Sequence, residues 1–465
     1  MTSANITSPL YLPDPHRPVW AGHLAFPALA LFSVAVWFLP AALGQAAWAA
    51  LAVALLLAIP LFWREGYTWL VLWLAPIAAF EPVPTQALRV AKYVLLASAI
   101  LLAVAKRNVA PWDKGRFDGK YLWPSLVLLV WLWICALWGS QPLAGAAEAA
   151  RLTLVAALLY LWLSEPLRFG GRKRHFVLWM VMAAFQVAVC VVEASAFGAL
   201  RSYGTFPNAN AMGSYLLMSG ALCFAAALSA EGRLRRTGLW ALFWALIFGL
   251  YLTGSRSAWL AFALCLLVMA SVARHWRTLA VGFLALAAMG VMYLTQPVFR
   301  LATNAALRFQ TGLTHRPLLW EAADRAREKV PLWGYGLEAS GEAMSREARY
   351  PSDIHRSILA PMMSAGNPHN YYRELHLETG LIGLALFAAA IAAIFMASWR
   401  ALGSLDQGRR NFALAVVGST VGLLVHAYFE RSLFLGSMSS AIFYWFVVSQ
   451  ALRGEEPMVQ TSTAS

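Results

Sequence analysis

The sequence predicts an all-α polytopic membrane protein with about 12–14 transmembrane helices. Of its 465 residues, 60% are hydrophobic and only 12% are charged, whereas soluble domains are about 45–50% apolar and about 25% charged. Apolar stretches of about 16–22 residues alternate with charged loops along the chain. They lack the alternation with period two that barrel strands show, and only helices or closed barrels satisfy the backbone in lipid.

About fourteen apolar stretches qualify as spans. In chain order they are 24–39, 46–62, 67–80, 88–105, 122–138, 149–163, 176–196, 211–229, 238–253, 257–272, 277–294, 378–398, 412–429 and 433–449. Several are short, so twelve full crossings with additional re-entrant or tilted pieces are an alternative.

Basic loops predict the orientation of these spans. Five clusters lie between them, at Lys106 to Lys120, Arg168 to Arg174, Arg233 to Arg236, Arg274 to Arg277 and Arg400 to Arg410. With the N-terminus in the cytoplasm, every cluster is cytoplasmic, as the positive-inside rule requires. The formal charge of +14 is therefore assigned to membrane topology, and no nucleic-acid partner is expected.

The expected organisation has five parts. They are a cytoplasmic N-terminal tail (1–23), transmembrane helices (24–295), a large outward loop or domain (296–377), C-terminal transmembrane helices (378–450) and a cytoplasmic tail (451–465). No small-residue cleavage site follows the first tail, so the first helix is expected to be an uncleaved anchor. Within the outward domain, residues 322–329 are good helix formers and Pro331 ends them.

The four cysteines, Cys135, Cys190, Cys223 and Cys265, all lie inside apolar stretches. They are expected to pack as small hydrophobic residues. Neither a disulfide framework nor a cysteine-based metal site is indicated.

Three polar patches, at 201–210, 254–259 and 368–373, fall on the outward side of the predicted bundle. Arg201 and Arg256 lie in the first two patches, and a guanidinium offers a fork of donors that matches phosphate oxygens. The two arginines could therefore clamp a pyrophosphate. The alternative for Arg256 is an arginine that snorkels to the interface, and the asparagines near Arg201 could simply cap the next helix.

His369 opens the third patch, with Arg373 and His376 on the same face if a helix has begun there. Histidine is the side chain best suited to proton transfer near neutral pH. A satisfied surface histidine is the alternative. The outward loops hold few aspartates and no Asp-x-Asp pair, while hard cations need clustered carboxylates, so no metal and no cofactor are expected.

Taken in order, these elements resemble those of the bacterial O-antigen ligase and polymerase superfamily. Ser255-Arg-Ser-Ala-Trp-Leu260 is similar to its Arg-x-x-x-Leu element. Arg316-Pro-Leu-Leu-Trp320, followed by Pro331 and Gly334-Tyr-Gly336, resembles its outer-loop stretch. His369-Asn370, nine residues before Gly380, resembles its His-Asn-x9-Gly element. The resemblance covers roughly residues 200–400, and the earlier spans agree with the family only in being apolar.

The resemblance implies a membrane-embedded glycosyltransferase of the GT-C type, independent of metal and inverting at the anomeric carbon. Its donor would be O-antigen polysaccharide on undecaprenyl pyrophosphate, and its acceptor lipid A–core oligosaccharide, as in lipopolysaccharide biosynthesis. The outward domain would then be periplasmic, the membrane the bacterial inner membrane, and both termini cytoplasmic.

The roles that follow are a general base for His369 and pyrophosphate binding for Arg201 and Arg256. Asn370 is expected to orient the histidine. Supporting roles go to Arg316, Trp320 and Arg373. The arginines of the outward domain are a further candidate surface for a phosphorylated acceptor, with a solvated helix face as the alternative; they are Arg300, Arg308, Arg316, Arg325 and Arg327.

Two related activities share these elements, an O-antigen polymerase and a protein O-oligosaccharyltransferase, and the acceptor distinguishes them. A flippase or transporter is a rival of another class. Transporters place ionisable groups near the bilayer midplane, whereas Glu193 is the main exception to an apolar midplane here.

Overall fold

A computed structural model describes residues 119–164, 171–196, 201–204, 208–277, 316–349, 368–431 and 438–454, with a few single positions between them. The chain divides into two compact units, Met1–Trp69 and Leu70–Ser465, and all of the described residues belong to the second. The predicted spans before residue 106 lie outside the described residues, as does most of the predicted span 277–294.

The described part is helical and contains no strand. Its helices are η1 (Gly119–Tyr121), α5 (Trp123–Trp138), α6 (Pro142–Ser164), α7 (Gly171–Ala196), α8 (Ala209–Leu228), α9 (Arg233–Leu252), α10 (Arg256–Val272), α13 (Arg316–Arg327), α14 (Ser340–Glu347), α16 (Tyr371–Ala401), α17 (Gln407–Ala427) and α18 (Met438–Leu452). Five of these, α6, α7, α8, α16 and α17, are long and apolar enough to cross a membrane. The chain is therefore an all-α, multi-pass membrane protein, as predicted.

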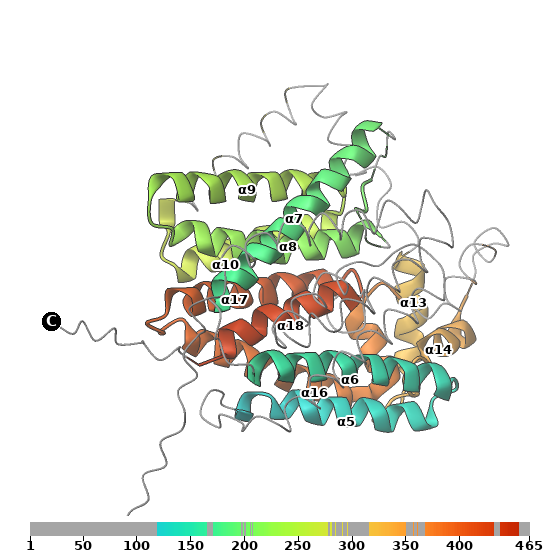
Figure 1. Ribbon diagram of the computed structural model, residues 1–465. Coiled ribbons are helices and arrows are strands. Elements are labelled where there is room, and N and C mark those ends of the chain that lie inside the picture. The colour runs from blue at the N-terminus through green and yellow to red at the C-terminus, as the bar shows by residue number, and fades with distance from the viewer. Residues whose placement is uncertain are drawn as a thin grey trace, which may run out of the picture. The chain divides into compact units, whose positions relative to one another are not determined.

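Helices from distant parts of the sequence pack together (Figure 1). α17 packs against α8, α10, α16 and α18, and it is the central element of the described bundle. α16 also packs against α5, which pairs with α6. All four cysteines are fully buried and unbridged, which confirms their prediction as packing residues.

α13 and α14 lie at one end of this bundle (Figure 1). They bury a small apolar core of their own, in which Leu319 and Met344 meet Leu377 of α16. The predicted helix at 322–329 is found as α13, which begins earlier, at Arg316, and ends before Pro331. The outer helices are thus anchored on the first turns of α16.

α16 is interrupted at Gly380, where φ is 69° and ψ is −167°. The segment after Pro331 fills this interruption, because Tyr335 N donates to Leu377 O at 2.8 Å and Gly336 N donates to Glu378 O at 3.0 Å. A Cβ atom on Gly380 would lie 2.0 Å from Leu332 O, which leaves no room for any other residue. The glycines of both sequence elements therefore belong to a single backbone junction.

Replacement of Gly380 by alanine is expected to destabilise the fold by about 1–3 kcal/mol, because a side chain is strained at this φ and ψ. Thermal unfolding in detergent measures the effect as a midpoint lowered by several degrees. Gly403→Ala is a matched control, since its Cβ atom would meet Arg400 O at an ordinary 3.5 Å. Equal midpoints for the two variants would show that the junction tolerates a side chain.

The other end of the bundle is held by Arg172 from the second predicted cytoplasmic cluster. Its guanidinium donates to Arg453 O and Gly454 O, both at 2.8 Å, and forms an ion pair with Asp406. The beginning of α7, the α16–α17 turn and the end of α18 thus meet at one point. This end holds charges that the sequence analysis assigned to the cytoplasm.

Candidate functional site

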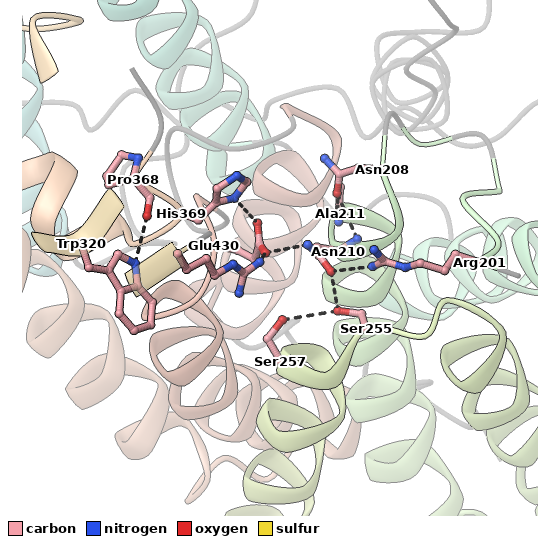
Figure 2. Close-up of polar contacts among 11 residues, drawn as sticks. Arg201, Asn208, Asn210, Ala211, Ser255, Ser257, Trp320, Pro368, His369 and Glu430 are labelled. Carbon is pink, nitrogen blue, oxygen red and sulfur yellow. Dashed lines mark hydrogen bonds and ion pairs between the residues drawn. The ribbon is translucent and has the colours of Figure 1, made fainter. Parts of the chain in front are cut away.

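The structure brings the first two polar patches together through Asn210, in the first turn of α8. Its side-chain oxygen accepts from Arg201 Nη2 at 3.2 Å and from Ser255 Oγ at 2.8 Å (Figure 2). Arg201 Nε also donates to Thr253 O at 3.2 Å. The loop before α8 and the turn before α10 are therefore joined by side-chain hydrogen bonds.

Glu430 connects this pair of patches to the third. It lies three residues after the end of α17, and its side chain is only 10% exposed. Its Oε1 accepts from Asn210 Nδ2 at 2.6 Å and forms an ion pair with Arg316, and its Oε2 lies 3.3 Å from His369 Nδ1 (Figure 2). A single carboxylate thus gathers an asparagine, an arginine and the predicted base.

The environment of Glu430 keeps it ionised. Burial alone would raise the pKa of this carboxyl. The hydrogen bond with His369 and the positive charge of Arg316 outweigh the burial, so the pKa lies below its usual value. An ionised carboxylate is a hydrogen-bond acceptor only, so it suits an imidazole that donates from Nδ1.

His369 has a left-handed backbone, with φ at 50°. The next residue, Asn370, is the N-cap of α16, and its side-chain oxygen accepts from Arg373 N at 3.0 Å. Asn370 was expected to orient the histidine, but its described contact caps the helix instead. The described contact to the imidazole ring comes from Glu430.

Arg256 is the first residue of α10 and is partly exposed. Its neighbour Ser255 is buried and bonded to Asn210. The backbone turns here through Gly254, at a φ of 58°. Because Ser255 is joined to the Glu430 cluster through Asn210, the chain places Arg256 next to this cluster.

The asparagine before α8 caps this helix, which is the alternative predicted for the asparagines near Arg201. Asn208 Oδ1 accepts from Asn210 N at 3.0 Å and from Ala211 N at 2.8 Å (Figure 2). Capping fixes the direction of the first turn of α8. Asn210, which follows it in that turn, has its side chain directed to Arg201 and Glu430.

The three supporting residues all lie close to the histidine. Arg316 begins α13 and pairs with Glu430. Trp320 Nε1 donates to Pro368 O at 3.0 Å, directly before His369. The guanidinium carbon of Arg373 lies 5.0 Å from the centre of the Trp320 ring.

The outward arginines expected to attract an acceptor are partly neutralised. Arg325 pairs with Glu321, and Arg327 with Asp324 at 3.0 Å. The alternative reading, a solvated helix face of internal ion pairs, therefore describes α13 better. Arg300 and Arg308 lie outside the described residues.

Sequence reasoning missed Glu430. Its signal was an acidic residue immediately after the apolar stretch 412–429, on the same predicted side as the three patches. An ionisable group at that place in a chain with so few charges is a candidate for function. Among the described residues, no group of three or more His, Cys, Asp or Glu side chains is placed to hold a metal ion, and independence of metal stays a prediction.

Comparison with known proteins gives one family. Residues 241–388 match the family model described as O-antigen ligase, a stretch that includes Arg256, Arg316 and His369. No curated protein matches the chain. The matching family comprises glycosyltransferases of the O-antigen ligase and polymerase type, membrane enzymes that act on lipid-linked glycans. Over residues 241–388, the chain therefore carries an O-antigen ligase domain.

Proposed function

We propose that the protein transfers O-antigen polysaccharide from undecaprenyl pyrophosphate to lipid A–core oligosaccharide. Transfer would take place at the periplasmic face of the inner membrane, without a metal and with inversion at the anomeric carbon. The observation that carries this proposal is the His369–Glu430 pair, in which Glu430 also pairs with Arg316 and is joined to Arg201 through Asn210.

The pair supplies the base that the reaction needs. A sugar hydroxyl is a weak nucleophile, and a positioned base contributes about 10²–10⁴-fold to such a step. With Nδ1 directed at Glu430, His369 takes the hydroxyl proton at Nε2 as the acceptor oxygen bonds to the anomeric carbon. The bond from that carbon to the pyrophosphate breaks, and undecaprenyl pyrophosphate leaves with the electron pair. Glu430 stabilises the imidazolium that results.

The arginines stabilise the leaving group. Negative charge grows on the pyrophosphate as its bond to the sugar breaks, and fixed donors at a site with little water bind that charge most strongly in the transition state. Three guanidinium groups against one carboxylate leave an excess of positive charge. Arg201 is fixed by Asn210 and Thr253, so little reorganisation is required of it.

Placement of the charges favours this chemistry over transport. Glu193, the main candidate that the sequence offered for an intramembrane acid, lies near the end of α7, where it accepts from Tyr203 N at 2.8 Å and Gly204 N at 2.9 Å. It therefore anchors the loop that carries Arg201. A flippase or transporter site at the midplane loses this main candidate residue.

Purified protein with a lipid-linked glycan donor tests the function, and the acceptor distinguishes the three related activities. The assay contains a chelator and offers lipid A–core, donor alone, or a pilin-like protein. Formation of lipopolysaccharide supports the ligase. Lengthening of the donor glycan would identify a polymerase, and a glycosylated protein would identify an O-oligosaccharyltransferase.

Lysine at position 201 or 256 is expected to lower the transfer rate about 100-fold, the usual loss for one donor to a developing anion. Lysine keeps the charge but cannot form the bidentate contact. Initial rates at saturating donor measure the effect, with Arg235→Lys on the exposed start of α9 as the control. Full activity of both variants would exclude a guanidinium clamp.

A further inference from the structure

We propose that Trp320, held by Arg373 and Asp324, is a positioning residue that sets the geometry of the His369–Glu430 pair. The proposal rests on the function proposed above, in which this pair activates the acceptor. It assigns to the outer helix α13 a part in catalysis without contact to substrate.

Trp320 contacts both segments that carry the pair, the one that leads to His369 and the one that leads to Glu430. Its Nε1 donates to the carbonyl of Pro368, the residue before His369, at 3.0 Å (Figure 2). Its ring packs edge-on against Tyr428, with centroids 5.5 Å apart, and lies 6.5 Å from Phe429, the residue before Glu430. One rigid indole therefore fixes the segment that carries the base and the segment that carries its carboxylate.

The indole is itself held by Arg373 and Asp324. The Arg373 guanidinium lies over its ring at 5.0 Å, an arrangement with cation–π attraction. Asp324, one turn after Trp320 on α13, holds that guanidinium through two hydrogen bonds, from Nε at 2.9 Å and from Nη2 at 2.8 Å. This bidentate bond holds the guanidinium in place, so the ring cannot turn without loss of its cation–π contact.

α13 provides a firm base for this arrangement. Leu319 and Ala323, the neighbours of Trp320 and Asp324, are fully buried in the core that includes Leu377 of α16. Arg327 Nε also donates to His376 Nδ1 at 2.8 Å. α13 and the first turns of α16 are therefore packed and hydrogen-bonded together next to His369.

His369 needs such support, because its backbone is in the left-handed region. A residue with a Cβ atom is strained in that conformation, so the free chain would rotate out of it. The hydrogen bond to Pro368 O holds the peptide before His369, and the Asn370 cap holds the chain after it. A displacement of about 1 Å at a reacting group can cost about 100-fold in rate.

The test compares Trp320→Phe and Asp324→Asn with the control Glu321→Gln, which changes an exposed ion pair on the same helix. Phenylalanine keeps an aromatic ring but cannot donate to Pro368 O. The expected result is a fall in kcat of about 10- to 100-fold for Trp320→Phe, with the KM for donor unchanged. Rates equal to those of Glu321→Gln would overturn the proposal.

A double-mutant cycle with His369→Asn separates positioning from other roles. If Trp320 acts through the histidine, Trp320→Phe lowers the remaining activity of His369→Asn no further. An equal loss in both backgrounds would show that Trp320 acts elsewhere. If His369→Asn is inactive and Trp320→Phe is fully active, the positioning role of Trp320 is refuted while the proposed base stands. If His369→Asn is fully active, the proposed base is refuted, and the positioning role is refuted with it.

Amide hydrogen exchange gives a readout that does not depend on activity. Peptides that cover residues 368–374 are expected to exchange faster in Trp320→Phe, while those from α10 and α17 keep the wild-type rate. No change around His369, or a uniform increase throughout the protein, would contradict the proposal, since the first shows no support and the second shows loss of the fold.

Discussion

Replacement of His369 by asparagine is expected to lower the transfer rate by about 10²–10⁴-fold, the contribution of a positioned general base. Asparagine is chosen because it tolerates the left-handed backbone better than most residues, and φ at this position is 50°. The loss can then be ascribed to the imidazole. Alanine would add backbone strain to the loss of the ring.

The rate is measured with lipid-linked donor and lipid A–core, and elution volume and unfolding midpoint in detergent serve as controls of folding. Donor binding should be retained, because the proposed pyrophosphate ligands are untouched. A variant that folds, binds donor and transfers at the wild-type rate would remove His369 from the mechanism.

Replacement of Glu430 by glutamine is expected to reduce transfer about 10- to 100-fold near neutral pH. Glutamine keeps the size of the side chain but removes the negative charge that stabilises the imidazolium. Initial transfer rates with lipid-linked donor and lipid A–core, measured beside wild type, give the size of the loss.

The negative charge of Glu430 should also affect how the stability of the fold depends on pH. The pKa of Glu430 is lowered in the folded protein, so its contribution to stability is present above the unfolded pKa of about 4.3 and is lost as pH falls through the folded pKa. Wild type and Glu430→Gln should therefore differ most at neutral pH and converge in acid. Glu347→Gln, in a more exposed pair with Lys329, is the matched control. Transfer by Glu430→Gln at the wild-type rate would exclude Glu430 as the partner of the base.

The sequence predicted the helices well because a helix that crosses a membrane needs about 20 apolar residues in succession, and such stretches are visible in the sequence. The predicted spans 122–138 and 257–272 correspond to α5 and α10 within one residue at either end. α16 shows the limit of that approach. Its apolar part begins near residue 378, but the Asn370 cap starts the helix at Tyr371, so Arg373 and His376 do share a helix that faces α13.

The candidate site was predicted as a set of residues but not as a network. Counting crossings placed Arg201, Arg256 and His369 on one side. It could not show that Asn210 and Glu430 join Arg201 to His369, because those contacts depend on how α8 and α17 pack. The glycines at 334 and 380 were recognised by resemblance alone, since only the folded chain shows that they meet.

The most direct test is transfer of glycan from undecaprenyl pyrophosphate to lipid A–core by purified protein, with wild type, His369→Asn and Glu430→Gln assayed side by side. We expect lipopolysaccharide from wild type, at least about a hundredfold less from His369→Asn, and about 10- to 100-fold less from Glu430→Gln. Wild-type rates from both variants would contradict a His369–Glu430 base.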